Sequence, residues 1–277
     1  MIKEKRCGKI KGRTVADGRK QRNLFKKEET TSPTVSNDAL MLSIIIDAKE
    51  RRDVATADVA GACLKADMID YALLKMEGES VDILCDACEV HRKFVVYEHG
   101  KKVLHLKLLK ALCGCVQSAL LWHELFAGSL QEMGFELNPH GTCIANKTIE
   151  GKQCTIAWHV DDTKMSHEDD KVVTSVTELI EERFGKMTVT RCKKHVFLGM
   201  DVNFCDDGTA TIKMKDYIKE SIAEFGESIV RTAATPARKD LFDINEKSGE
   251  LTTAARKIFH SVVAKLLYVS KRGRQDM

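Results

Sequence analysis

Helical and strand-like hydrophobic periodicities are interleaved along this sequence, without the regular alternation that builds a parallel sheet. Apolar residues at helical spacing predict helices over 37–51, 118–133, 172–184, 215–225 and 252–269. A buried strand is predicted over 53–63, and two hairpins are predicted over 154–166 and 196–214. Helices mixed with hairpins in this order predict an α+β fold.

The two predicted hairpins differ in their turns. Asp207 and Gly208 separate arms at 196–204 and 209–214, and both residue types tolerate the positive φ of a tight turn. Asp161, Asp162 and Thr163 separate the arms at 154–160 and 164–166, so we expect two carboxylates at the tip of the first hairpin.

Length and composition exclude some classes of protein. The chain has 277 residues, 43% of them hydrophobic, which is enough for one large domain or two. Its longest apolar-rich stretch, 40–46, is far shorter than the roughly 20 residues of a membrane-spanning helix, so no membrane insertion is expected. No signal-peptide pattern is present, so we expect a reducing compartment and ten cysteines present as thiols.

Positive charge is concentrated at the N-terminus. Residues 1–27 contain 11 Lys and Arg against 2 acidic residues, a local charge of +9, so the remaining chain carries −6 of the total of +3. Such a basic arm suits contacts with phosphates, and a solvated tail is the alternative.

Three carboxylates are candidate ligands for a divalent cation. Asp58 lies among small apolar residues in a predicted buried strand, where a lone charge is costly, and Asp161 and Asp162 lie in a predicted turn. Magnesium needs only one or two carboxylates besides substrate phosphates. The residues alone also allow a structural role, because adjacent aspartates are common in turns. No glycine-rich phosphate loop is present, which argues against P-loop and dinucleotide-binding enzymes.

Four blocks in order, 58–64 (DVAGACL), 112–118 (LCGCVQS), 158–162 (WHVDD) and 197–201 (FLGMD), resemble the reverse transcriptase of copia-type LTR retrotransposons. The resemblance extends from about Lys11 to Asp276 and is strongest to the copia-like elements of diatoms. It implies an RNA-directed DNA polymerase that uses dNTPs and a primed RNA or DNA template.

The resemblance also implies a right-hand polymerase fold, with an antiparallel palm sheet flanked by helices. The fingers would comprise 1–52 and 66–105, the palm 53–65 and 106–205, and the thumb and start of the connection 206–277. RNase H and integrase regions of the parent polyprotein are expected to be absent. The family's location is the cytoplasm, within virus-like particles, and a nuclear location is the alternative.

Site residues follow from the resemblance, block by block. Asp58, Asp161 and Asp162 would be catalytic and, together with Val59, would bind two Mg²⁺ ions, or Mn²⁺. Residues from three separate segments would contact the incoming nucleotide, and residues later in the sequence would form the primer grip. These residues are Lys11, Arg13, Cys63 and Gln117 for the nucleotide, and Phe197, Leu198 and Gly199 for the primer grip. For Phe197 and Leu198 a plain core role is the alternative.

This sequence departs from the family at several positions. Cys63, Cys113 and His159 stand where aromatic residues are usual, and the small Cys63 should leave a gap that weakens discrimination against ribonucleotides. Cys192 stands where related elements tend to have glycine, so a positive φ there would be strained. A catalytically decayed remnant, acting at most as a nucleic-acid-binding module, is therefore the alternative function.

Two further features remain open. Cys85, Cys88 and His91, with His99 nearby, have a spacing compatible with zinc, although reduced thiols are the favoured interpretation. The cations Lys271, Arg272 and Arg274 could contact a template backbone, but we expect an exposed, frayed terminus.

Overall fold

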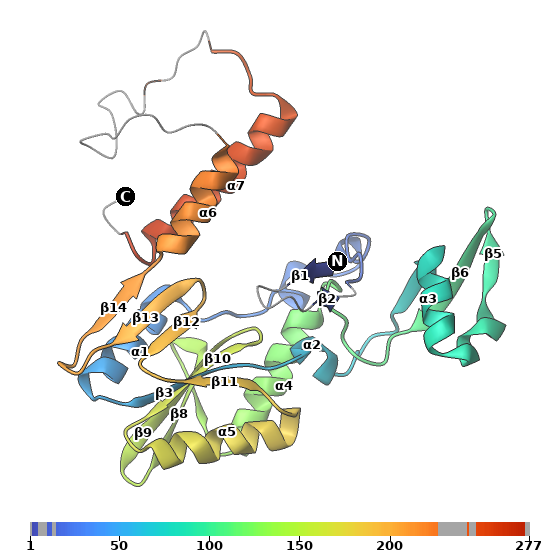
Figure 1. The fold of residues 1–277 in the computed structure, drawn as a ribbon. Helices are drawn as coiled ribbons and strands as arrows, with labels where there is room; N and C mark the ends of the chain where they lie inside the picture. The colour runs from blue at the N-terminus through green and yellow to red at the C-terminus, as the bar shows by residue number, and fades with distance from the viewer. Residues whose placement is uncertain (1, 5–9, 13–14, 227–242, 244–247, 275–277) are drawn as a thin grey trace.

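A six-stranded antiparallel sheet forms the centre of the molecule, here called the central sheet (Figure 1). The computed structural model describes residues 2–4, 10–12, 15–226, 243 and 248–274. The strand order is β11–β3–β10–β9–β8–β7, with bounds Thr188–Arg191, Asp53–Asp58, Asp162–His167, Lys152–His159, Gly141–Ile149 and Glu136–Asn138. The central strands therefore come from segments about 100 residues apart in the sequence.

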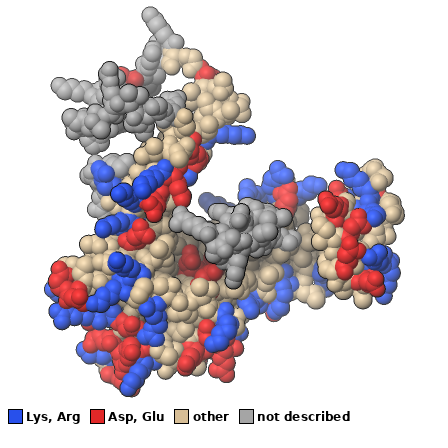
Figure 2. All heavy atoms as spheres, viewed as in Figure 1, with Lys and Arg blue, Asp and Glu red and all other residues tan. Residues whose placement is uncertain are grey.

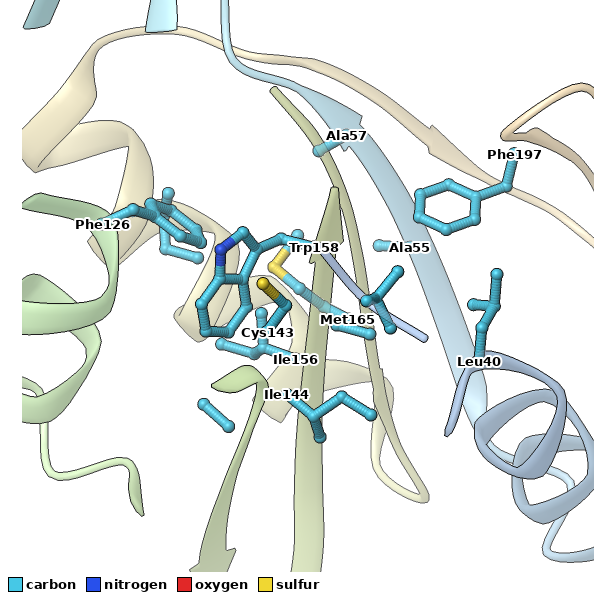
Figure 3. Close-up of a cluster of buried hydrophobic side chains, with 14 of the residues drawn as sticks. Leu40, Ala55, Ala57, Phe126, Cys143, Ile144, Ile156, Trp158, Met165 and Phe197 are labelled. Atoms are coloured by element: carbon cyan, nitrogen blue, oxygen red, sulfur yellow. The ribbon is translucent and has the colours of Figure 1, made fainter. Parts of the chain in front are cut away.

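Helices cover both faces of the central sheet. On one face lie α4 (Ser118–Glu132) and α5 (Asp170–Phe184), where Trp122 and Phe126 of α4 pack against Phe184 of α5 and Trp158 of β9. On the other face lies α1 (Asn37–Lys49). Figure 3 shows Trp158 and Phe126 on one side of β3 and Leu40 and Phe197 on the other. The predicted α+β arrangement is confirmed.

Local sequence signals explain where the helices begin and end. The Ser36 hydroxyl accepts a hydrogen bond from the Ala39 N–H at 3.2 Å, and the Asp169 carboxylate accepts one from the Lys171 N–H at 2.8 Å, so both side chains cap the first turn of a helix. Gly185, with φ of +85°, ends α5 directly after Phe184. These starts and stops lie close to the predicted ones.

The predicted strand 53–63 is too long. β3 ends at Asp58, and the short helix α2 (Ala62–Lys65) follows a left-handed Gly61 at φ of +66°. The apolar run continues past the strand because Val59 and Ala62 are buried in the same core as the strand residues. Hydrophobic periodicity alone does not distinguish a strand that continues to residue 63 from a strand followed by a short helix.

A separate small unit follows, which the periodicities did not predict. It comprises β4 (Leu73–Glu77), α3 (Glu79–Ala87), a 3₁₀ turn η3 (Glu89–Phe94), β5 (Val96–Glu98) and β6 (Lys101–Lys107), with sheet order β4–β6–β5. We call it the outlying unit. It has a small core of its own, with Val81, Cys85 and Leu104 buried, and stands away from the central sheet in Figure 1.

The second predicted hairpin is a three-stranded sheet. The predicted arm 196–204 contains two strands, β12 (Lys194–Phe197) and β13 (Met200–Phe204), because Leu198 and Gly199 turn the chain with φ of +47° and +72°. β14 (Ala210–Lys213) follows the predicted turn, where Gly208 has φ of +81°. The helices α6 (Lys215–Phe225) and α7 (Thr253–Ser270) then lie side by side.

Near the N-terminus β1 (Ile2–Glu4) pairs with β2 (Ile10–Gly12), and the 3₁₀ turns η1 (Gln21–Asn23) and η2 (Lys27–Glu29) follow. Figure 2 shows the α6–α7 pair and the outlying unit on either side of a hollow, with Lys and Arg side chains on both. In the described ranges no helix combines the length and apolar character needed to cross a bilayer.

Candidate active site

The pairing register of the central sheet brings the predicted carboxylates together. Asp162, the first residue of β10, lies directly opposite Asp58, the last residue of β3. The Val59 N–H donates to the Asp161 carbonyl at 3.1 Å, which fixes the end of β3 to the adjacent turn. The expectation that both aspartates occupy the hairpin tip is corrected, because only Asp161 lies in the two-residue turn.

That turn has an unusual backbone conformation. It consists of Val160 and Asp161, and Val160 has φ of +57° although it is β-branched. A positive φ at the first turn residue is what a type II′ hairpin loop requires, and glycine is the usual residue there. The buried Trp122 indole N–H donates to the Val160 carbonyl at 2.6 Å. Helix α4 thereby holds the turn that carries Asp161.

Burial and mutual repulsion make this end of the sheet electrostatically unfavourable for carboxylates. The pKa of Asp162 is raised above its usual value, first by burial and then by the negative charges of Asp161 and Asp58. The charges of Asp161 and Asp58 therefore repel the Asp162 carboxylate, and a cation placed among them would relieve that repulsion.

His159 pairs with Asp162 across the hairpin and lies half-buried. Burial, and then the positive charge of Arg272, lower the pKa of its imidazole, while Asp161 opposes them. His159 Nδ1 is buried and has no hydrogen-bond partner in the structure. His159, which stands where the family usually has an aromatic residue, is therefore neutral near neutral pH.

Cys63 and Cys113, two of the substituted aromatic positions, lie together. Burial raises the pKa of the Cys63 thiol to about 12, with further contributions from the hydrogen-bonded Cys113 thiol and from the charge of Asp161. Cys63 therefore lies next to Cys113 and within electrostatic range of Asp161. The nine described cysteines are all free.

The remaining nucleotide-binding candidates are Gln117, Lys11 and Arg13, which come from other segments of the chain. Gln117 precedes α4, and its side-chain amide donates to the Asp70 carboxylate at 2.8 Å, which joins the helix start to the segment leading into the outlying unit. Lys11 lies on β2, and Arg13 lies outside the described residues. The structure thus links Gln117 to Asp70.

The predicted primer-grip residues form the tight turn between β12 and β13. Phe197 is buried in the main core, so the alternative of a core role is confirmed for this side chain. Leu198, which packs half-buried against the same core, and the exposed Gly199 form the turn, and the Tyr268 hydroxyl donates to the Leu198 carbonyl at 2.6 Å. Tyr217 stacks on Tyr268, with ring centroids 5.2 Å apart.

Two other expectations are wrong. Cys192 does not have a positive φ, so its side chain causes no strain of the kind expected, and its thiol donates to the Lys194 carbonyl at 2.7 Å. The chain around Lys271 is not frayed, because the Asn37 side chain donates to the Lys271 carbonyl at 2.8 Å and Arg272 stacks on Tyr268 at 3.6 Å.

The carboxylates partly fit the metal ions that the resemblance implies. Asp58 and Asp162 face each other, Asp161 adjoins them, and burial, followed by the charges of Asp161 and Asp58, raises the pKa of Asp162. Yet in the described segments no three His, Cys, Asp or Glu side chains converge as a ready-made metal site, at Cys85 and Cys88 or elsewhere. The set therefore suits a hard cation that completes its shell with substrate or water oxygens.

Sequence reasoning missed two residues of this site, Trp122 and Tyr268, and gave Arg272 only as an alternative contact to a template backbone. Trp122 and Tyr268 carry donors on otherwise apolar helix positions, which was the available signal, because a buried indole or phenol needs a polar partner. Nothing local indicates which carbonyl each would reach, since Trp122 and Tyr268 bond to turns 38 and 70 residues away.

Comparison with known proteins identifies the class. Residues 2–239 match the family model described as reverse transcriptase (RNA-dependent DNA polymerase). The chain therefore belongs to this reverse transcriptase family. The family match and the antiparallel sheet flanked by helices together confirm the predicted right-hand polymerase fold class.

Individual relatives are more distant. The putative transposon Ty5-1 protein of Saccharomyces cerevisiae is 25% identical over 175 residues, which cover 62% of this chain and 54% of that protein. The chain thus spans about half the length of this curated relative.

Solved structures also show similarity. The protease–reverse transcriptase of prototype foamy virus has 15% identity and a TM-score of 0.39 over 97% of this chain and 33% of that one. Telomerase from Candida albicans has 11% identity and a TM-score of 0.35 over 74% of this chain and 41% of that one.

Proposed function

We propose that this chain is the reverse transcriptase domain of a copia-type LTR retrotransposon and catalyses templated DNA synthesis from a primer. The observation that carries the proposal is the register that sets Asp58 opposite Asp162, with Asp161 in the adjoining turn, in a chain of the reverse transcriptase family. The resemblance to the copia-like elements of diatoms is part of the same proposal.

The chemistry assigned to this site is phosphoryl transfer. Asp58, Val59, Asp161 and Asp162 would hold two magnesium ions, or manganese. Bound there, the ions would activate the primer 3′-hydroxyl and neutralise charge on the dNTP triphosphate. The protein's part is to hold the three half-buried carboxylates in fixed register, and β3, β10 and the Val160 turn support this role.

The domain boundaries belong to the same proposal. The central sheet lies within the proposed palm, 53–65 and 106–205, and the outlying unit with the N-terminal segments forms the fingers, 1–52 and 66–105. The α6–α7 pair belongs to the thumb, 206–277. Primed template would occupy the hollow between these parts, and Lys11, Arg13 and Gln117 would meet the nucleotide. The location of this activity would be cytoplasmic particles.

Primer extension on an RNA template tests the proposal. We expect extension that requires magnesium, and we expect Asp161→Asn to abolish it, because the amide removes a metal-binding charge with little change in volume. Asp207→Asn, at the exposed turn before β14, is the matched control and should extend normally.

Absence of extension by the unaltered chain would refute the polymerase proposal. If that chain still bound primed template with a strong salt dependence, the remaining function would be nucleic-acid binding by a decayed remnant.

A further inference from the structure

The last turn of α7 and the residues after it reach the candidate active site. Val269 is fully buried in the main core, and the carbonyl of Lys271 accepts the hydrogen bond from Asn37 at the start of α1. A Cβ at Gly273 would lie 3.1 Å from the Met214 sulfur, so the chain packs closely there too. This end of the described chain is held in place by contacts with three other segments.

Arg272 is connected to both tight turns of the site through the residues that adjoin them. Its guanidinium stacks on the Tyr268 ring at 3.6 Å, and the Tyr268 hydroxyl holds the Leu198 carbonyl of the β12–β13 turn. The same positive charge acts on the imidazole of His159, which adjoins the Val160 turn, and Tyr268 is within electrostatic range of Asp162. Arg272 therefore adjoins the Tyr268 ring that holds the predicted primer grip, and its charge reaches His159, which precedes the Val160 turn.

The Arg272 guanidinium has an N–H donor without a hydrogen-bond acceptor. Arg272 Nε is buried and has no hydrogen-bond partner, and the described ion pairs include none with Arg272. A buried donor without an acceptor is costly, and a guanidinium presents several donors in a fork that matches phosphate oxygens. The stack on Tyr268 fixes the orientation of the fork, so little side-chain entropy remains to be lost on binding.

We propose that Arg272, seated on Tyr268, binds a backbone phosphate of the primer strand near its 3′ end. The inference rests on the proposed function for the identity of the strand. The Leu198–Gly199 turn and Arg272 then form one surface, assembled by the Tyr268 hydroxyl, and the last turn of α7 must stay packed in the main core for the primer to be held.

Equilibrium binding of a fluorescent primer–template, measured over a series of KCl concentrations without dNTPs, tests the inference. Each phosphate contact contributes about 0.9 to the slope of log K against log salt. We expect Arg272→Gln to weaken binding about tenfold and to reduce the slope by roughly one. Arg272→Lys keeps the charge and should retain the slope of the unaltered chain.

Lys49→Gln provides the matched control, because Lys49 is an exposed cation at the far end of α1, the helix whose first residue bonds Lys271. It should leave both affinity and slope unchanged. Arg272→Met, which keeps an apolar contact with the Tyr268 ring, gives the same measurement in a second neutral variant should the glutamine variant fail to fold.

An unchanged slope in the folded neutral variants would overturn the inference, since a purely structural role alters affinity without removing a phosphate contact. This binding measurement does not depend on whether the chain catalyses primer extension. A chain that binds but never extends a primer refutes the polymerase proposal, while the slope of its Arg272 variants still decides whether this cation meets a phosphate.

Discussion

At the scale of single residues, charge governs the candidate site. Asp162 keeps a carboxylate at the half-buried start of a strand, next to two others, and this arrangement costs folding free energy unless a cation is present. Such a cost is a common feature of functional sites, where groups are placed for chemistry at the expense of stability.

Asp162→Asn should therefore stabilise the cation-free protein at neutral pH. Because the folded pKa is raised, protonation favours the folded state. Asp162 thus contributes stability that is fully present below its ordinary pKa of 3.8 and lost as pH rises through the raised value. We expect a gain of up to about 1 kcal/mol at pH 7 in EDTA, since part of the group remains in water. The gain should disappear below the ordinary value, as urea titrations across pH would show.

Asp207→Asn provides a control of opposite sign. The Thr209 hydroxyl and N–H donate to the Asp207 carboxylate and lower its pKa, so the native group contributes stability at neutral pH that is lost as pH falls through the lowered value. A loss of stability in Asp162→Asn at pH 7 would contradict the account of the site.

Cys63 tests nucleotide selection at the same scale. Cys63→Tyr should restore a bulky side chain beside Asp161 and raise the preference for dNTPs over rNTPs about tenfold or more. Competitive incorporation assays would measure the ratio, with Cys88→Tyr, on an exposed position of the outlying unit, as control. Equal discrimination by the unaltered and tyrosine proteins would refute a role for Cys63 in selection.

At the scale of elements, the site depends on two hairpin turns that are unfavourable by themselves. Val160 and Leu198 both have positive φ, which costs of order 1–3 kcal/mol for residues that are not glycine. In each case an aromatic donor from a helix binds the carbonyl of the strained residue: Trp122 for Val160 and Tyr268 for Leu198. Tertiary contacts thus maintain conformations that the local sequence disfavours.

Trp122→Phe should slow catalysis without weakening primer–template binding. The substitution keeps an aromatic ring in the core but removes the N–H that fixes the Val160 carbonyl, and a lost hydrogen bond corresponds to up to about tenfold in rate. Single-turnover extension measures the rate, and anisotropy measures binding.

Phe126→Leu is the matched control, because Phe126 belongs to the same helix and core and packs against Trp122. It should lower the melting temperature with a smaller effect on rate. If both variants lose rate only in proportion to their loss of stability, Trp122 has a packing role alone.

At the scale of the whole molecule, one buried ion pair ties α1 to the central sheet. Lys164 of β10 and Asp47 of α1 form a salt bridge, and both side chains are at most 3% exposed. Lys164 shares a sheet face with Asp162, two residues earlier, so this contact supports the strand that carries a site carboxylate.

Lys164→Met should destabilise the protein by about 3–5 kcal/mol, because it leaves the Asp47 carboxylate buried without a cation. The double variant Asp47→Leu/Lys164→Met should recover most of that loss. Lys152→Met, which breaks the exposed pair with Glu168, should cost less than about 1 kcal/mol. Denaturant titrations of the unaltered protein, Lys164→Met, Asp47→Leu and the double variant complete the cycle, and additive losses would show that the pair is not coupled.

Much of the fold was predictable because local physics specifies it. The helix over 172–184 has an apolar stripe, a capping aspartate and a terminal glycine, all close in sequence. The turn within the segment 196–204 was missed because Leu198 carries no turn signal and its conformation depends on contacts with Tyr268. The outlying unit was missed because its short strands alternate weakly and bury few residues.

The sequence by itself determined the class of elements, the family and the three candidate carboxylates, since periodicity, motif order and residue chemistry are local properties. Only the tertiary structure decided that Asp162 lies opposite Asp58, that Trp122 holds the Val160 turn, and that Arg272 reaches the site from the far end of the chain. These relations join residues 38 to more than 100 positions apart. The register of a sheet and the docking of a helix are set by the packing of the whole core, which no local pattern encodes.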